Sequence, residues 1–477
     1  MPRFRAVAVA VTAICALLLV TGCTRSVDGR AVSIYDNPFQ VAGLPTTSGP
    51  SGPREDAPPP ALSARNGDGG EIDTLALSAV TDVEAYWSEH YDAEFEGDFE
   101  PVQKLISWSA RDSRKDSVEF CTESTYRMVN AAYCRLDNSI GWDRELLLPT
   151  MADTFGQMAV VMVIAHEYGH AIQNNADIVG DDDPVIVKEQ QADCFAGAYM
   201  RWVAEGRSDY FTVNTSDGLN SVLAATVAIR DSDPDDPESV HGSAFERVTA
   251  VQVGFTDGAK GCKGIDMEEI EQRRGDLPQS FDGASGEFEI TQQSLVELGK
   301  ALAVILPTEN EPTYSYEGAE VECRDGVSTE PVTYCPASNT IATNVEGLAE
   351  RGTAADDSDV PLPVKVTGDY NGYVVFISRY TLSVQKNRDQ DLVGAKTGLR
   401  AACLSGVATG ELAQPGRSQG DITLAAGDLD EAVSGLLTDG LAASDVEGKT
   451  VPSGFSRVDA FRAGVLGGED TCSARYE

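Results

Sequence analysis

The order of apolar and polar positions predicts helices over 73–90, 154–174, 187–205, 218–230 and 244–256. Within the second of these, Ala159–Ala165 (AVVMVIA) is apolar on every side, which is typical of a buried helix. Between the first two helices, Cys121–Trp142 reads as the short strands of a hairpin stapled by its cysteines. The pattern therefore predicts an α+β domain in which a buried helix crosses a second helix.

The second half of the chain repeats features of the first. The stretch 156–173 (GQMAVVMVIAHEYGHAIQ) resembles the one that ends in 372–385 (GYVVFISRYTLSVQ). Tyr133-Cys134 recurs as Tyr334-Cys335, and FERV and FSRV begin at positions 245 and 455, which are 210 residues apart. Coincidence between Ala/Val-rich helices is the alternative. We predict a tandem repeat with domains at 71–275 and 285–477, each of ordinary domain size.

The N-terminus has the features of a bacterial lipoprotein. Two arginines, a short apolar core and small residues precede Cys23, so 1–22 reads as a signal peptide cleaved before a cysteine that is then lipidated. The apolar run is too short to span a bilayer. A plain cleaved signal without lipid is the alternative. Residues 23–70, rich in Pro, Gly and Ser, are predicted to be a disordered tether.

The charge balance limits the partners. The formal net charge is −40, with 36 Lys and Arg against 76 Asp and Glu. Such a surface argues against nucleic acid and against adsorption to anionic lipid. The remaining body of roughly 400 residues is larger than a single core usually organises, which again favours two domains.

The stretch with the clearest chemistry is 166–170, HEYGH. On a helix, His166 and His170 share a face and can offer two imidazole nitrogens to one metal ion. Glu167 lies beside that face, where its carboxylate can act as general base on a water at the metal. A chance match on a core helix is the alternative.

A catalytic zinc site needs a third protein ligand. Glu189 and Asp193 are four residues apart on the next predicted helix. We predict that Glu189 is the third ligand and that Asp193 accepts a hydrogen bond from the free ring nitrogen of His166 or His170. A solvated acidic face is the other interpretation. Nearer acids compete for the ligand role but lie in a predicted loop; they are Asp177, Asp181, Asp182 and Asp183.

HEYGH is followed along the chain by EQQADCFAG (189–197), HGSAFERV (241–248) and Cys262. These motifs resemble those of a bacterial family of neutral zinc metallopeptidases, and the resemblance covers about 73–266. It implies a zincin-like α+β fold and a zinc-dependent peptidase with one Zn²⁺ per chain. It also draws attention to His241, as a donor to the oxyanion of the transition state or as a residue that only orders its loop.

The repeat lacks this chemistry. The two histidines and three acids fall opposite residues that cannot replace them, and no histidine follows His241. We therefore expect a degenerate second domain without metal, kept for packing, substrate capture or an envelope partner. The facing pairs are His166/Ser378, Glu167/Arg379, His170/Leu382, Glu189/Gly398 and Asp193/Ala402.

The cysteines follow the repeat as well. With Cys15 removed and Cys23 lipidated, eight remain, an even number that suits an oxidising compartment. Two equivalent copies favour the same pairing twice, whereas zinc ligation by cysteine would not explain why the copy without histidines keeps them. The predicted disulfides are Cys121–Cys134, Cys194–Cys262, Cys323–Cys335 and Cys403–Cys472.

Together these features predict a zinc endopeptidase tethered by Cys23 to the extracytoplasmic face of a bacterial membrane. Its substrate would be a peptide or protein. The alternative is a non-catalytic envelope scaffold with a closed structural zinc, in which an intact Glu167 would have no use.

Overall fold

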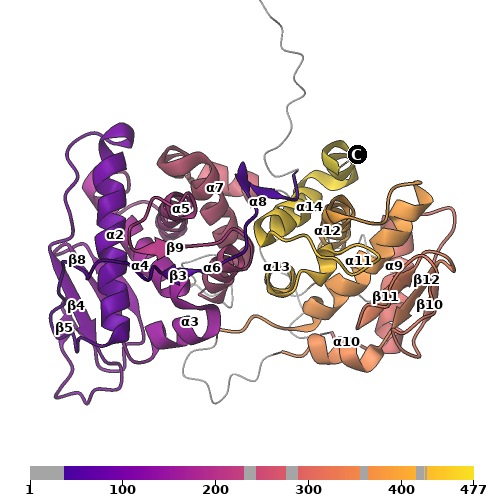
Figure 1. The fold of residues 1–477 in the computed structure, drawn as a ribbon, viewed down its shortest axis with the longest axis horizontal. Helices are drawn as coiled ribbons and strands as arrows, with labels where there is room; N and C mark the ends of the chain where they lie inside the picture. The colour runs from indigo at the N-terminus through magenta and orange to yellow at the C-terminus, as the bar shows by residue number, and fades with distance from the viewer. Residues whose placement is uncertain are drawn as a thin grey trace, which may run out of the picture. The chain divides into compact units, whose positions relative to one another are not determined.

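The computed structural model describes residues 37–229, 243–274, 288–354, 364–414, 424 and 427–476. In these ranges helices alternate with small sheets, so the fold is mixed α and β (Figure 1). We call 71–275 the first half and 285–477 the second half.

The sheet of the first half has the order β4-β8-β7, with β4 (Lys104–Trp108) parallel to β8 (Ser139–Asp143) and β7 (Ala131–Cys134) antiparallel to it. Because side chains alternate along a strand, Leu105 joins the main core while Ile106 faces the other way. On that other face, a small hairpin formed by β5 (Glu119–Phe120) and β6 (Glu123–Ser124) packs Phe120 against Ile106. The predicted stapled hairpin is present as β7 and β8, and Cys121–Cys134 joins it to β5 and β6.

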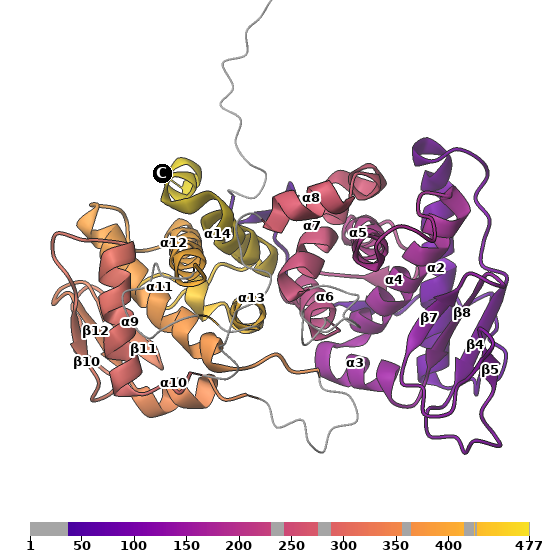
Figure 2. The same ribbon diagram turned by 180° about the vertical axis from the view of Figure 1, so that it is seen from behind.

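Each predicted helix is present, with shifted ends. They are α2 (Glu71–Glu94), α4 (Gln157–Ala176), α5 (Val185–Ala204), α6 (Asp217–Ala228) and α7 (Ala244–Lys263). The helix predicted to start at 154 is divided, because Gly156 adopts a positive φ of 84° between α3 (Leu147–Phe155) and α4. A short α8 (Met267–Arg274) follows α7. The helices lie to one side of the sheet in both views (Figures 1 and 2).

Helices α5 and α7 pack closely. A Cβ added to Gly254 would lie 1.8 Å from the carbonyl oxygen of Cys194, and one added to Gly197 would lie 2.2 Å from that of Val251. Only glycine therefore permits this approach of the two backbones. The Cys194–Cys262 disulfide joins the same two helices.

The second half has a sheet of the same connectivity. Its order is β10-β12-β11, with β10 (Thr313–Ser315) parallel to β12 (Thr340–Thr343) and β11 (Val332–Cys335) antiparallel to it. The Cys323–Cys335 and Cys403–Cys472 disulfides are present as predicted. Its helices are α9 (Gln292–Ile305), α10 (Val345–Arg351), α11 (Asp369–Asn387), α12 (Ala395–Leu412), α13 (Asp428–Thr438), η1 (Leu441–Ala443) and α14 (Gly454–Tyr476).

The two halves share one hydrophobic core. Helix α6 contacts α13 and α14, and the rings of Phe255 and Phe455 lie 5.1 Å apart. The side chain of Asn220 accepts a hydrogen bond of 2.7 Å from the backbone N–H of Gly454. The halves therefore stabilise each other directly.

Part of the predicted tether is ordered, which corrects the sequence-based expectation for residues 37–70. Strands β1 (Gln40–Val41) and β2 (Leu44–Pro45) form a hairpin, and β3 (Gly52–Pro53) pairs with β9 (Phe211–Thr212). The backbone N–H of Thr47 donates to the hydroxyl of Thr215 at 2.8 Å. The composition of this segment led to the prediction of disorder. Hydrogen bonds from its backbone and hydroxyl groups nevertheless attach it to the rest of the protein. The signal peptide and Cys23 lie outside the described residues.

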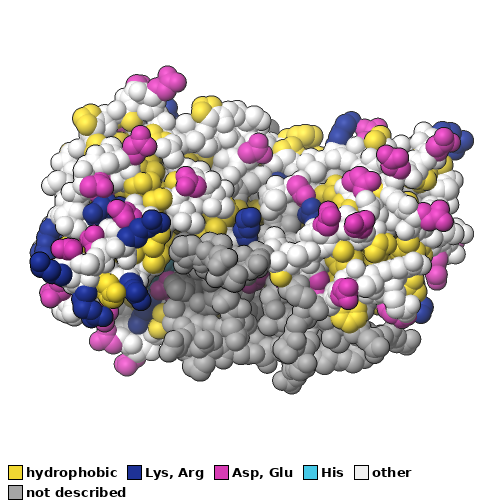
Figure 3. All heavy atoms as spheres, turned by 90° about the horizontal axis from the view of Figure 1, so that it is seen from below, with side chains coloured by type: hydrophobic (Ala, Val, Ile, Leu, Met, Phe, Trp, Pro, Cys, Tyr) yellow, Lys and Arg dark blue, Asp and Glu magenta, His cyan; other side chains and the backbone are white. Residues whose placement is uncertain are grey.

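Lysine and arginine side chains gather at the end of the first half that carries β4 and β5, and acidic side chains lie both among them and elsewhere on the coloured part of this face (Figure 3). Among the residues that the structure describes, none of the helices combines the length and apolarity needed to cross a bilayer.

Candidate metal centre

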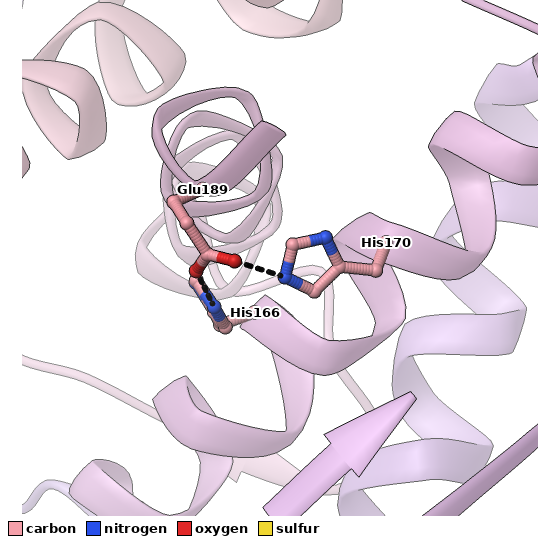
Figure 4. Close-up of side chains that lie close together, drawn as sticks. All are labelled: His166, His170 and Glu189. Atoms are coloured by element: carbon pink, nitrogen blue, oxygen red, sulfur yellow. Dashed lines mark ion pairs between the residues drawn. The ribbon is translucent and has the colours of Figure 1, made fainter. Parts of the chain in front are cut away.

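The structure brings His166, His170 and Glu189 together, as predicted. Both histidines project from α4, and Glu189 reaches them from α5 (Figure 4). His166 Nε2 lies 3.2 Å from Glu189 Oε2, and His170 Nε2 lies 3.5 Å from Glu189 Oε1. One ligand atom from each residue lies within 4.8 Å of the others.

These separations suit one small dication. Zinc binds imidazole nitrogen and carboxylate oxygen at about 2.1 Å, and a tetrahedral angle then places two ligand atoms about 3.4 Å apart. The two observed nitrogen–oxygen distances of 3.2 and 3.5 Å lie on either side of that value. Each imidazole approaches a different oxygen of Glu189, and two imidazoles with one carboxylate form a donor set of the kind that binds zinc.

The remaining ring nitrogens are held by the protein. His166 Nδ1 lies 2.8 Å from Asp193 Oδ1, which places Asp193 in its predicted position and selects His166 as its partner. His170 Nδ1 lies 2.9 Å from Gln173 Oε1, an interaction that the sequence analysis missed. With both Nδ1 atoms bonded to acceptors, both Nε2 atoms are free to face Glu189.

Arg247 extends this network. Its Nε and Nη2 donate to the two oxygens of Asp193 at 2.8 and 2.7 Å, and both side chains are fully buried. Burial alone would raise the pKa of Asp193, but Arg247 and His166 hold it at about 2. The sequence did not indicate that Arg247 pairs with Asp193, because the pair depends on the packing of α7 beside α5.

The helices approach closely enough because residue 169 of HEYGH is a glycine. A Cβ on Gly169 would lie 2.8 Å from Cα of Ala192 on α5, closer than real Cβ atoms come. The small residues on both sides let Glu189 reach the two histidines. The motif therefore contributes to the helix crossing as well as supplying two candidate ligands.

Glu167 lies beside the ligands on α4. Its Oε2 accepts a hydrogen bond of 2.9 Å from the backbone N–H of Tyr133 on β7. Burial raises the pKa of Glu167, and the nearby imidazoles only partly oppose this. A carboxylate with a raised pKa is a better proton acceptor at neutral pH.

The histidines are basic in the metal-free protein. Burial opposes their protonation, but Asp193 and Glu189 outweigh it, so the pKa of His166 rises to about 10. Glu189 likewise raises the pKa of His170. A metal ion must displace these protons when it binds.

A pocket of 290 Å³ opens beside the ligands. Its walls come from β7, α4 and α5, and they include Tyr133, Arg135, His170, Asn174, Lys188 and Glu189. The ligand cluster is therefore accessible from one side.

The other candidate residues have simpler surroundings. His241 lies outside the described residues. His90 stacks on Tyr86, and its Nδ1 lies 2.7 Å from the Tyr86 carbonyl oxygen, so it is partly buried rather than a free surface residue. The acidic loop between α4 and α5 stays apart from the ligands. In that loop, Asp181 forms an ion pair of 2.5 Å with Arg135.

No protein-family model matches the chain. Similar curated proteins come from Mycobacterium bovis and from two strains of Mycobacterium tuberculosis, and all are named only as uncharacterized proteins. Each is 27% identical over 154 residues, which is 27% of this chain and 53% of the relative. The chain thus spans about half the length of the curated relatives it matches. No solved structure matches it.

Proposed function

We propose that the protein is a zinc-dependent endopeptidase whose metal is held by His166, His170 and Glu189. The observation that carries the proposal is that these three groups lie within 4.8 Å of one another, beside Glu167, with His170 and Glu189 on the wall of an accessible pocket. A structural zinc would be better served by a fourth protein ligand and would not need Glu167.

When bound, zinc would polarise the peptide carbonyl and lower the pKa of water. The protein supplies the proton transfers. Glu167 accepts the proton of the attacking water and then donates it to the departing amine. The Tyr133 N–H holds the carboxylate beside the ligands, while Asp193 and Gln173 fix the orientation of the two imidazoles.

The test combines metal content with hydrolysis. Wild-type protein should bind one zinc per chain and cleave peptides from an internally quenched library. Glu167→Gln should keep the zinc and lose at least about 100-fold in kcat/KM, the scale of general-base catalysis. Glu84→Gln is the matched control, because Glu84 is a half-buried glutamate on α2 that bonds to Tyr168 instead. Equal activity of Glu167→Gln and wild type would refute the mechanism.

We further propose that the second half is a degenerate copy of the first. The support is the shared sheet connectivity, the paired disulfides and a positive φ at Gly258 and Gly468, 210 residues apart, which kinks α7 and α14. Arg379, opposite Glu167, is buried and donates to the carbonyl oxygen of Val332 on β11. A crystal structure in which the two halves do not superpose would refute the duplication.

The location is a separate proposal. Attachment through Cys23 would place the body outside the cytoplasm, where four disulfides can form. Metabolic labelling with a fatty acid should mark the wild type and not Cys23→Ala. Equal labelling of the two proteins would refute lipidation at Cys23.

A further inference from the structure

The pocket beside the ligands is cationic, although the protein as a whole is strongly acidic. Arg135 and Lys188 line it, in a chain whose net charge is −40. Arg135 follows the last residue of β7, and alternation places it on the same side as Tyr133, while Cys134 points the other way into its disulfide. Lys188 directly precedes Glu189 on α5.

The protein itself neutralises these charges weakly. Arg135 pairs with Asp181, but the Asp181 side chain is 91% exposed and that of Arg135 is 56% exposed. Exposed pairs contribute little, because water solvates both partners well. Among the residues that the structure describes, the one acceptor of the Lys188 ammonium group is the backbone carbonyl of Asp181, at 3.5 Å. Glu189 directs its carboxylate at the two imidazoles.

Arg135 is oriented for a planar anion. Its Nε donates to Asn174 Oδ1 at 3.0 Å, which fixes the plane of the guanidinium group, and Nη1 donates to Asp181. Nη2 has no acceptor within the described part of the chain. A guanidinium group presents its donors in a fork that matches a carboxylate. An incoming carboxylate can therefore engage Nη2 and compete with the exposed Asp181.

We propose that this pocket binds a carboxylate of the peptide substrate through Arg135 and Lys188. Because His170 and Glu189 form part of the same wall, the carboxylate belongs to a residue next to the bond that is cleaved. A volume of 290 Å³ is at the small end for ligand sites, which suits one side chain or one chain end. This inference rests on the proposed peptidase function and names its substrate class.

Two sources can supply the carboxylate, and matched peptides separate them. Two quenched libraries would carry Glu or Gln at one fixed position and be otherwise randomised; a second pair would end in a free acid or an amide. Wild type should cleave the carboxylate member of one pair about tenfold faster. The pair that shows the preference identifies a side chain or a chain terminus as the source.

Variants then test the two residues. In Arg135→Gln and Lys188→Gln the preference for the carboxylate peptide should fall. In the double variant the carboxylate and the uncharged peptide should be cleaved at equal rates. Lys104→Gln is the matched control, because Lys104 is an exposed lysine with an ion pair to Asp137 on the wall of a different pocket. Its preference should equal that of wild type. Equal cleavage of both members of each pair by wild type would overturn the inference and leave the peptidase function standing.

A binding measurement covers the case in which nothing is cleaved. Zinc-loaded Glu167→Gln would be titrated against fluorescein-labelled versions of the same peptides, and anisotropy would be recorded. Tighter binding of the carboxylate member, lost on adding Arg135→Gln, would support the pocket even if wild type hydrolyses no peptide. Equal binding of both members would overturn it.

Discussion

Replacing Arg247 by methionine should destabilise the protein and weaken metal binding together. The substitution keeps a buried side chain of similar length but removes both donors to Asp193. Among the described residues, Asp193 is then a buried carboxylate whose remaining side-chain partner is His166, at 2.8 Å. Breaking a buried ion pair in this way costs about 3–5 kcal/mol. Loss of the group that orients a metal-binding histidine lowers metal affinity by about 10–100-fold.

A double-mutant cycle separates the interaction energy between Arg247 and Asp193 from the effect of losing each side chain alone. Urea unfolding of metal-free wild type, Arg247→Met, Asp193→Ala and the double variant gives the four free energies of unfolding. We expect the double variant to lose at least about 2 kcal/mol less than the sum of the single losses, because no unpaired charge remains. Additive losses, or an Arg247→Met protein within about 1 kcal/mol of wild type, would refute the reasoning.

Gly169→Ala should weaken zinc binding and destabilise the fold by about 1–3 kcal/mol, because the added methyl group meets the α5 backbone at Ala192. Gly180→Ala, in an exposed loop with its nearest atom at 3.6 Å, should bind zinc like wild type. Zinc binding at pH 7 should release more than one proton, since the pKa of His166 is about 10 and that of His170 is also raised in the metal-free protein. Zinc affinity should accordingly rise with pH up to about 10; calorimetry in buffers of different ionisation enthalpy measures the release, and a value near zero would contradict the protonated site. Replacing Cys194 and Cys262 by serine opens a loop of 68 residues and should cost about 4 kcal/mol by loop entropy. The same change at Cys403 and Cys472, 69 residues apart, should cost as much stability but leave zinc affinity nearly unchanged, and equal zinc loss in both variants would contradict a local effect.

The sequence predicted best what depends on local spacing. The two histidines of HEYGH are one helical turn apart, so their common face followed from the motif, and Glu189 and Asp193 followed from the same periodicity on the next helix. The partner of Asp193 could not be predicted in this way, because Arg247 is 54 residues further along the chain. Gln173 was missed although it lies three residues after His170, because the presence of a glutamine there does not by itself indicate that its side-chain oxygen accepts from His170. The ordered 37–70 segment was missed because its attachments are hydrogen bonds to distant loops.

The disulfide between α5 and α7 makes the geometry of the candidate site depend on the redox state of two cysteines. Cys194 directly follows Asp193, and Cys262 lies on the helix that supplies Arg247, so one covalent bond joins the two elements that orient His166. In a reducing cytoplasm these thiols would stay reduced, and α5 and α7 would lack that bond. If the protein is the exported hydrolase proposed above, oxidation after export would act as a maturation step that keeps the newly made enzyme latent in the cell that synthesises it.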